Sequence, residues 1–535
     1  MPTTSSTSLT LPRDTNQALG IGEFACDFMA GQGEPDPAVL DRTRLFFTDS
    51  VLCGISALAL GTNAPTILRE EALSYPNPIG VSVFGSTMPL APEKAIAANC
   101  AAVREWDANG TNFGYNPALG HTAGEFGHND FYPVAVAAAQ LAGRDGADAL
   151  RGMICLDEIR GRLAEVFSLK TYRIDHVVHG AIASAAVYGA MLGATPEQIE
   201  SAIGMFVAHY IPWRAIRAGK QLSDSKGASA AISTEAAVLS MQRSLMGFIG
   251  PRDIFRNPEA IWRQFEPTDG DSPFDLVLSH SGGDFAVMGM HFKLGLYEHQ
   301  SAGALQGLIN LLQANPSIVQ SPDAIQSIKI VAYEPAFGII GDPAKRDPRT
   351  RQSADHSMVY IVSRMLKKAF DLAKSGGGGH AGPDASGRSG AGGHSAALRS
   401  DNDGWWKALM LLPEDFSHAA IMDKDTRALM AKITFEHGGP EYDAKYPDGI
   451  PTSVVISMAD GAAHDSGLVM YPAGHARNTT ADLDDILAAK FQRLGSLALA
   501  SPGPIVDRFN AVGDLSADDL RTLYDFEILD RGRFE

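Results

Sequence analysis

Segments rich in alanine recur through the first half of the chain and restrict the folds open to it. They include EKAIAANCAAVREW (93–106), DFYPVAVAAAQLAG (130–143) and HGAIASAAVYGAMLG (179–193). Small side chains let helix axes approach closely, so several such segments together favour a compact bundle. We therefore predict an all-helical domain over residues 1–287.

A different pattern begins after about residue 284. SIKIVAYEPAF (327–337) and MAKITFEHGG (430–439) alternate apolar and polar residues, as half-buried strands do. Two further β-rich runs flank Asp460-Gly461, which is a hairpin signal. We predict an α+β domain over 288–476, inserted into a mainly α protein whose C-terminal helices, 477–535, rejoin the first domain.

Two segments have the composition of unstructured chain. The first residues are rich in Ser and Thr, and residues 375–397 consist largely of Gly, Ser and Ala. Neither can bury a core, so we expect disorder at the start and a flexible surface insertion at 375–397.

Charge and cysteine content exclude several classes of function. The 535 residues carry a formal net charge of -18, which disfavours nucleic acid and anionic membranes as partners. The four cysteines lack a C-x-x-C pair, so they predict neither a disulfide framework nor a zinc or iron–sulfur cluster. With no evident signal peptide or membrane span, a soluble cytoplasmic protein is the simplest prediction.

A polar stretch between two Ala-rich segments, REWDANGTNFGYNPALGHTAGEFGHNDFYP (104–133), is the strongest candidate for a site. Asp107 and His128 could share proton transfer there, because histidine titrates near neutral pH. The alternative is a polar loop in which both residues cap helices. A metal bound by Asp107, His121 and His128 is a further alternative, but no established ligand spacing supports it.

Two other segments carry candidate binding groups. His176 precedes a long apolar helix, where a helix N-terminus could hold a substrate carboxylate, although it could equally be a cap or a core histidine. Lys226 begins another helix and could offer a point charge to a carboxylate. Arg214, Arg217 and Lys220, which lie upstream, add to a cationic region in an acidic protein.

Two candidates lie in the predicted α+β domain. His299 occurs in YEHQSAGA, just past the change of domain, where clefts form. Tyr360 occurs in DHSMVY, and its hydroxyl could donate or accept a hydrogen bond, although most tyrosines only pack.

The order of these motifs resembles the 2-methylcitrate dehydratase family (MmgE/PrpD), which also includes cis-aconitate decarboxylase. The resemblance extends from TDSVLCG (48–54) to GHARN (474–478). The positions that carry it are Asp107 in WDANGT, His128 in FGHNDFYP, His176 in RIDHVVHG, Lys226 in SDSKGAS, His299 in YEHQSAGA, Tyr360 in DHSMVY and Arg477 in GHARN.

The resemblance implies a fold and a reaction. Members have a helical domain, an inserted α+β lid and a cleft between them, are typically homodimers, and need no metal or other cofactor. It implies a small tricarboxylate substrate and a hydro-lyase reaction, the dehydration of 2-methylcitrate in propionate breakdown. Alternatives are decarboxylation of cis-aconitate to itaconate, an isomerase or epimerase reaction, or a non-catalytic binding role.

The resemblance also implies roles for these side chains. Asp107 and His176 would form the proton-transfer pair, with acid and base unassigned. Lys226, His128 and Arg477 would bind carboxylates. His299 and Tyr360 would join the site from the lid.

Three departures concern the substrate. Gly110 stands where relatives often have a second acid, and His128-Asn129-Asp130 replaces the usual His-Pro-Ser. The loop 111–127 is longer than in the bacterial dehydratases.

Overall fold

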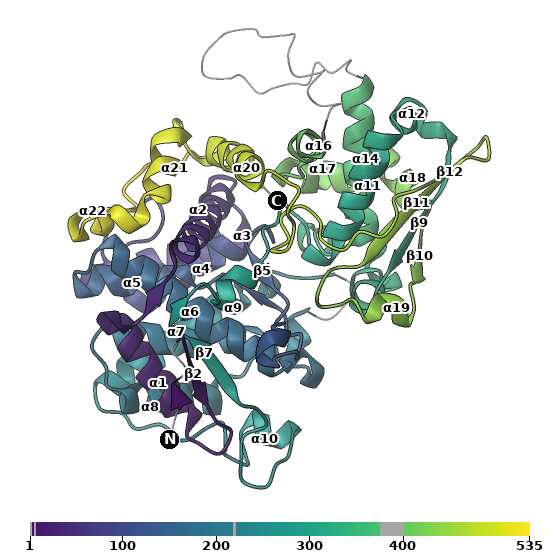
Figure 1. The fold of residues 1–535 in the computed structure, drawn as a ribbon. Helices are drawn as coiled ribbons and strands as arrows, with labels where there is room; N and C mark the ends of the chain where they lie inside the picture. Colours follow the sequence, from purple (N-terminus) through teal and green to yellow (C-terminus); the bar gives the residue numbers. More distant parts are fainter. Residues whose placement is uncertain (1–2, 5–6, 218–220, 375–400, 535) are drawn as a thin grey trace.

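Helices dominate the protein, as predicted (Figure 1). The computed structural model describes residues 3–4, 7–217, 221–374 and 401–534. The predicted flexible insertion at 375–397 lies outside the described residues, and so does Lys220.

The helical part is built around α7. Every residue of α7 is buried, and it packs against α1, α5, α6, α8 and α9. At Gly180 in α7, a Cβ atom would lie 2.1 Å from the ring of Phe131, so only glycine fits there. The helices of this part are α1 (Gln17–Asp27), α2 (Pro37–Ala59), α3 (Asn63–Leu73), α4 (Pro92–Arg104), α5 (Tyr132–Ala142), α6 (Gly146–Val166), α7 (Val177–Met191), α8 (Pro196–His209), α9 (Ser225–Leu245) and α10 (Ile261–Phe265).

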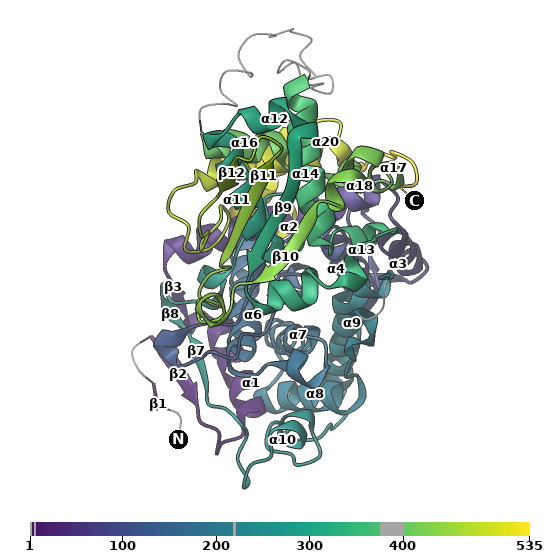
Figure 2. The same ribbon diagram turned by 90° about the vertical axis from the view of Figure 1, so that its right-hand side faces the viewer.

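A four-stranded sheet forms the centre of the α+β part, and its strands confirm those predicted. Its order is β10-β9-β11-β12, with β10 and β9 parallel and the other neighbours antiparallel. Helix α11 (Ala302–Ala314) packs on β11, and α14 (Met358–Lys374) packs on α11 and α12 (Ser317–Gln320) (Figure 2). The strands are β9 (Ile325–Ala332), β10 (Ile433–His437), β11 (Thr452–Met458) and β12 (Ala463–Asp465). The smaller helices are α13 (Arg351–Ala354), α16 (Asn402–Leu409), α17 (His418–Ile421), α18 (Lys424–Met430) and α19 (Pro440–Asp443).

The prediction of disorder at the N-terminus is wrong for residues 8–11. They form β2 (Ser8–Leu11), which pairs antiparallel with β7 (Leu276–Ser279) of the helical part. Leu11 of β2 is buried, and so are Leu276 and Leu278 of β7. A long-range strand partner, which composition does not reveal, orders the segment.

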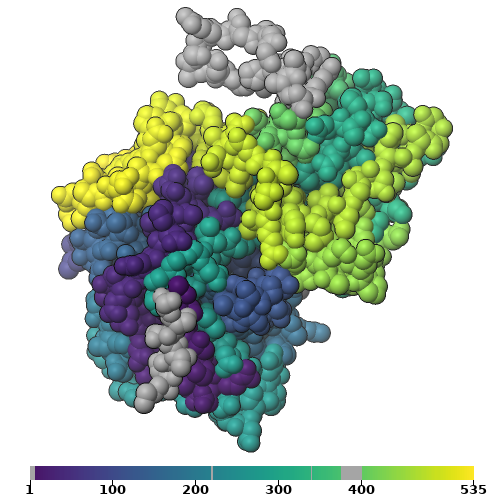
Figure 3. Space-filling view, in the orientation of Figure 1, coloured from purple at the N-terminus to yellow at the C-terminus, as the bar shows by residue number. Residues whose placement is uncertain are grey.

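The C-terminal helices pack against the beginning of the chain. Helix α20 (Leu483–Ala498) contacts α2, and α22 (Ala517–Arg521) contacts α5. In Figure 3 the yellow C-terminal segment lies beside the purple N-terminal region, with α21 (Pro502–Asn510) between α20 and α22 in the chain. The limits at 287/288 and 476/477 stay predictions.

The described residues include no single helix with the length and apolar character to cross a membrane. The bent pair of α2 and α3 meets those two criteria only when both helices are taken together.

Candidate active site

A cavity of about 100 Å³ lies between the helical part and the α+β part. Most of its lining is polar, with apolar contributions from Phe113, Phe126, Leu222 and Ile340. The helical part supplies Arg104, Asp107, Thr111, His128, His176, Arg214, Arg217 and Lys226. The α+β part supplies Glu298, Gln300, Lys345 and His356. The structure therefore brings four predicted residues together: Asp107, His128, His176 and Lys226.

The polar stretch after α4 folds so that Asp107 and His128 meet. Asp107 lies in a turn at φ 48°, a left-handed conformation that Asp tolerates better than most residues. The chain then forms β5 (Thr111–Asn112), which pairs antiparallel with β6 (Gly127–His128). This pairing holds Thr111 opposite His128 and closes the loop between them.

Asp107 is buried at the centre of a cluster of basic side chains. Its carboxylate accepts a hydrogen bond from Arg104 Nη1 at 2.6 Å and one from Lys293. Lys226 Nζ lies 3.6 Å from it, and His356 Nδ1 lies 3.1 Å from it. Burial alone would raise the pKa of Asp107, but these neighbours hold it well below its usual value. Asp107 therefore stays ionised at neutral pH.

His128 and His176 lie side by side, with ring centroids 5.2 Å apart. Arg104 Nη2 is 3.3 Å from His128 Nε2, and since Arg can only donate, this contact assigns Nε2 as the acceptor. Neither ring nitrogen of His176 has a hydrogen-bond partner among the described residues. Burial is the main cause that lowers the pKa of both imidazoles well below 6.5, so both are neutral bases near pH 7.

The other cations of the cavity differ in whether they are paired. Arg217 forms a two-pronged ion pair with Asp175, and Lys226 Nζ donates to Asp355 Oδ1 at 2.8 Å. In the described part of the chain, no carboxylate forms an ion pair with Arg214 or Lys345, although the charge of Asp175 acts on Arg214 and the charge of Glu298 acts on Lys345. Arg214 comes from the turn before α9, and Lys345 comes from the α+β part. These two charges, one from each part, are available to a bound anion.

Three predicted site residues lie outside this cavity lining. His299 is buried, with its ring centroid 5.6 Å from that of Phe113, and it stacks on His291. Tyr360 is buried, and its hydroxyl donates to the backbone carbonyl of Asp415 instead of facing the cavity. Helix α14 carries Tyr360 away from the site, whereas His356, which precedes the helix in the same motif, lines it.

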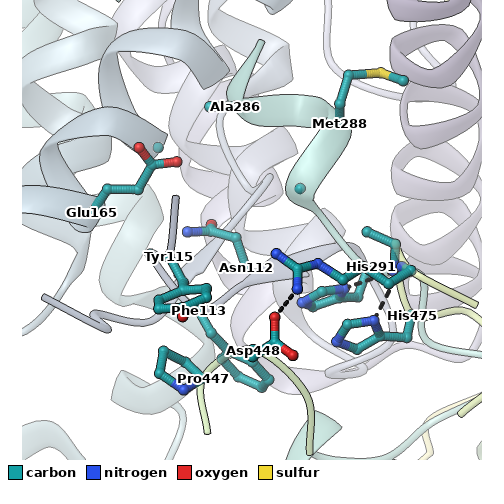
Figure 4. Close-up of a pocket in the computed structure, with 15 residues that line it drawn as sticks. Asn112, Phe113, Tyr115, Glu165, Ala286, Met288, His291, Pro447, Asp448 and His475 are labelled. Atoms are coloured by element: carbon teal, nitrogen blue, oxygen red, sulfur yellow. Dashed lines mark hydrogen bonds and ion pairs between the residues drawn. The ribbon is translucent and has the colours of Figure 1, made fainter. Parts of the chain in front are cut away.

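Arg477 lines a second cavity of about 120 Å³. There it forms an ion pair with Asp448, beside the stacked rings of His291 and His475, whose centroids are 4.0 Å apart (Figure 4). Phe113 lines both cavities. Arg477 therefore lies outside the lining of the Asp107 cavity, and its carboxylate-binding role stays a prediction.

Sequence reasoning missed several residues of the site. Lys293 and His356 contact Asp107 directly, and Glu298 and Lys345 line the cavity. His356 and Glu298 lie inside the DHSMVY and YEHQSAGA motifs, where the resemblance directed attention to Tyr360 and His299. Each motif contains two polar residues, and this could have indicated the second candidate. Deciding which of the two faces the cavity requires the course of the backbone, which the sequence does not give.

Asp107, Asp355 and His356 place three potential ligand atoms within 4.8 Å of one another. Four cations already neutralise this cluster, because Arg104, Lys293, Lys226 and Arg351 form ion pairs with its carboxylates. A divalent cation would be repelled by those side chains. The cluster is an ion-pair network among the described residues, and a reaction without a metal stays a prediction.

Packing explains one departure from the family pattern. A Cβ atom at Gly110 would lie 2.5 Å from the ring of Phe46 and 3.1 Å from Asn129 Oδ1. A second acid therefore cannot fit at Gly110 without moving Phe46.

Comparison with known proteins identifies the family. The chain matches the MmgE/PrpD N-terminal domain over residues 21–272 and the MmgE/PrpD C-terminal domain over residues 410–502. The chain belongs to the MmgE/PrpD family.

Named relatives give the class of reaction. The chain is 24% identical to 2-methylcitrate dehydratase of Escherichia coli over 456 residues, 82% of each chain. It is 26% identical to the mitochondrial 2-methylcitrate dehydratase of Yarrowia lipolytica over 471 residues, 85% of this chain and 79% of the relative. It is 24% identical to 2-methylcitrate dehydratase of Cupriavidus necator over 475 residues, 84% and 85%. The chain is an enzyme of the lyase class to which these relatives belong.

Proposed function

We propose that this enzyme is a 2-methylcitrate dehydratase, which eliminates water from 2-methylcitrate to give 2-methyl-cis-aconitate in propionate breakdown. One observation carries the proposal. The same cavity is lined by Arg214 and Lys345, which form no ion pair among the described residues, and by His176, which is neutral and has no hydrogen-bond partner among them. Such a cavity suits removal of a proton from a polyanionic acid. The names of the relatives supply the particular substrate.

Binding of the substrate is assigned to the cations. A tricarboxylate brings about three negative charges at neutral pH. Arg214 and Lys345 form no ion pair among the described residues that must break before they bind it, so they would be its first partners. Lys226 and Arg104, which belong to the charge cluster around Asp107, would attract the substrate by their positive charge. His128, held by Arg104, would donate its Nδ1–H to a substrate carboxylate.

His176 is the base in this proposal. A base must be unprotonated, must have a lone pair that no hydrogen bond uses, and must lie beside the reacting carbon. His176 is unprotonated near pH 7 and has no hydrogen-bond partner among the described residues, so it meets the first two of these requirements. Asp107 is a poor proton acceptor because its cations stabilise the ionised form. Its role would be to orient Arg104, Lys226 and Lys293, so the two members of the predicted proton-transfer pair receive different roles.

Negative charge would spread onto the carboxylate next to the carbon as its proton leaves. Cations fixed in a cavity with little water stabilise such a charge more strongly than water does. The proposed mechanism uses only side chains and no metal. The homodimeric state and the cytoplasmic location stay predictions.

A substrate panel tests the proposal. Purified enzyme is mixed separately with 2-methylcitrate, citrate and cis-aconitate, and the absorbance of the unsaturated product is followed with and without a chelator. We expect the fastest absorbance increase with 2-methylcitrate. Carbon dioxide release from cis-aconitate, without turnover of 2-methylcitrate, would contradict the proposal and indicate a decarboxylase.

A further inference from the structure

Glu298 is a cavity carboxylate that the proposed function does not yet use. It lies before the short turn His299–Ser301, and its Oε2 accepts a hydrogen bond from the backbone N–H of Gln300 at 2.9 Å. Its backbone N–H donates to the carbonyl of Asp355 at 2.9 Å. His299 and Gln300 are buried, but Glu298 is only half-buried and lines the cavity. Its side chain is therefore fixed at one oxygen, with surface left for a ligand.

The surroundings of Glu298 differ from those of Asp107. Burial, followed by the negative charge of Asp107, raises the pKa of Glu298 to about 7, against the opposing charges of Lys293 and Lys345. The titratable groups coupled to it by charge include Asp107, Lys293, Lys345, Tyr333 and Tyr446. Both phenols are neutral near pH 7, because burial raises their pKa well above 10. One cavity thus contains a carboxylate that stays ionised and a carboxyl that carries a proton for part of the time.

Two carboxyl groups with different proton affinities in one site are a recurring arrangement for separating acid and base roles. Asp107 is saturated by cations and cannot deliver a proton at neutral pH. The neutral histidines are suited to accept protons. His356 Nδ1 lies 2.7 Å from Asp355 Oδ1 and 3.1 Å from Asp107 Oδ2. The pKa of His356 is lowered to about 3, mainly by burial, so it carries no proton to donate near pH 7. Among the carboxyl groups and histidines that line the cavity in the described part of the chain, Glu298 is the one suited to donate a proton.

We propose that Glu298 is the general acid of this site and protonates the leaving hydroxyl, an inference that rests on the proposed dehydration. His176 takes the proton from the carbon, and those electrons form the double bond. The C–O bond breaks, the hydroxyl takes the proton of Glu298, and water leaves. Glu298 is then a carboxylate and His176 an imidazolium, and transfer of one proton through solvent restores both.

The charge of the substrate favours this assignment. An ionised Glu298 would add a second carboxylate to a cavity that already contains Asp107 and must admit about three more negative charges. A protonated Glu298 avoids that repulsion and offers an O–H instead. Bound substrate therefore raises the pKa of Glu298 further. The basic limb of kcat should lie at higher pH than the basic limb of kcat/KM, since kcat/KM reports the free enzyme.

The test compares pH profiles of the full-length enzyme and its Glu298→Gln variant. We expect wild-type kcat/KM to fall above about pH 7, because the acid is then ionised. In Glu298→Gln, kcat should fall by about 10²–10⁴-fold with KM changed only a few-fold, and the basic limb should disappear. Glu298→Asp should recover part of kcat. The exposed Glu334→Gln in the same part of the chain is the matched control and should behave as wild type.

Folding and ligand binding of the Glu298→Gln variant are checked with the unreactive propane-1,2,3-tricarboxylate, which should stabilise wild type and variant against heat to a similar extent. Suppose that wild type is active and that Glu298→Gln keeps the basic limb and a kcat within about threefold of wild type. That result overturns the role of Glu298 and leaves the proposed dehydration standing. A wild type that turns over none of the tricarboxylates overturns the proposed dehydration, and the role of Glu298 with it.

Discussion

Lys490 of α20 forms a buried ion pair with Asp49 of α2, with Nζ and Oδ1 2.6 Å apart. The same Nζ donates to the carbonyl of Ala108 at 2.7 Å and to the carbonyl of Lys293 at 2.8 Å. Ala108 follows Asp107 in the chain, and the side chain of Lys293 donates a hydrogen bond to Asp107. One side chain of the C-terminal helices thus joins the two backbone segments that hold the charge cluster.

Lys490→Met should lower the free energy of unfolding by about 3–5 kcal/mol, because it leaves Asp49 buried without a partner. Urea unfolding measures this. The double variant Lys490→Met with Asp49→Asn should recover part of the stability but not turnover, because neither change restores the two hydrogen bonds to Ala108 and Lys293. Full turnover in the double variant would show that Lys490 matters only for stability.

Arg214→Ala and Lys345→Ala should each raise KM by about tenfold or more and change kcat less, since each removes a charge that meets the substrate. Neither variant breaks an ion pair that the described residues show, so thermal stability should be largely retained. The neighbouring Arg346→Ala, which is exposed and outside the cavity lining, is the control for Lys345→Ala. An unchanged KM in both variants would remove these cations from the binding site.

Tyr360→Phe should keep turnover within about twofold of wild type, although the resemblance places Tyr360 in the site. Its hydroxyl is used in a hydrogen bond to Asp415, so the loss should be one of stability, about 0.5–1.5 kcal/mol. Steady-state kinetics and thermal unfolding separate the two effects. A large fall in kcat with an intact fold would show that α14 brings the hydroxyl to the substrate during turnover.

Extended dialysis against a strong chelator should leave turnover unchanged, because Arg104, Lys226, Lys293 and Arg351 already neutralise the carboxylates near His356. Activity is measured before and after dialysis, alongside the metal content of the enzyme. Loss of turnover that a single divalent metal restores would contradict the metal-free mechanism.

The sequence was sufficient for much of the fold. Alternating residues predicted β9 and β10, and the Asp460-Gly461 pair predicted the β11–β12 hairpin, because these signals act within a few residues. Residues 8–11 were predicted to be disordered from their composition, and the prediction failed because they pair with β7, more than 260 positions away. Pairing over that distance has no signature in local composition.

The site was predicted in part for a related reason. Asp107, His128, His176 and Lys226 lie in motifs that can be recognised singly, and the structure brings them together. For the two motifs of the α+β part, the predicted residues His299 and Tyr360 lie outside the cavity lining, and their catalytic role stays a prediction. Neighbouring residues in a turn point in different directions, so the cavity contains Glu298 and not His299, and His356 and not Tyr360.

Replacement of the base tests the central claim most directly. Turnover of 2-methylcitrate is measured for wild type and for His176→Asn, whose circular dichroism and thermal unfolding must match those of wild type. We predict that wild type produces 2-methyl-cis-aconitate and that kcat of His176→Asn falls by about 10²-fold or more, because the neutral imidazole that accepts the proton is absent. Near-normal turnover by His176→Asn, with its fold intact, would contradict the account.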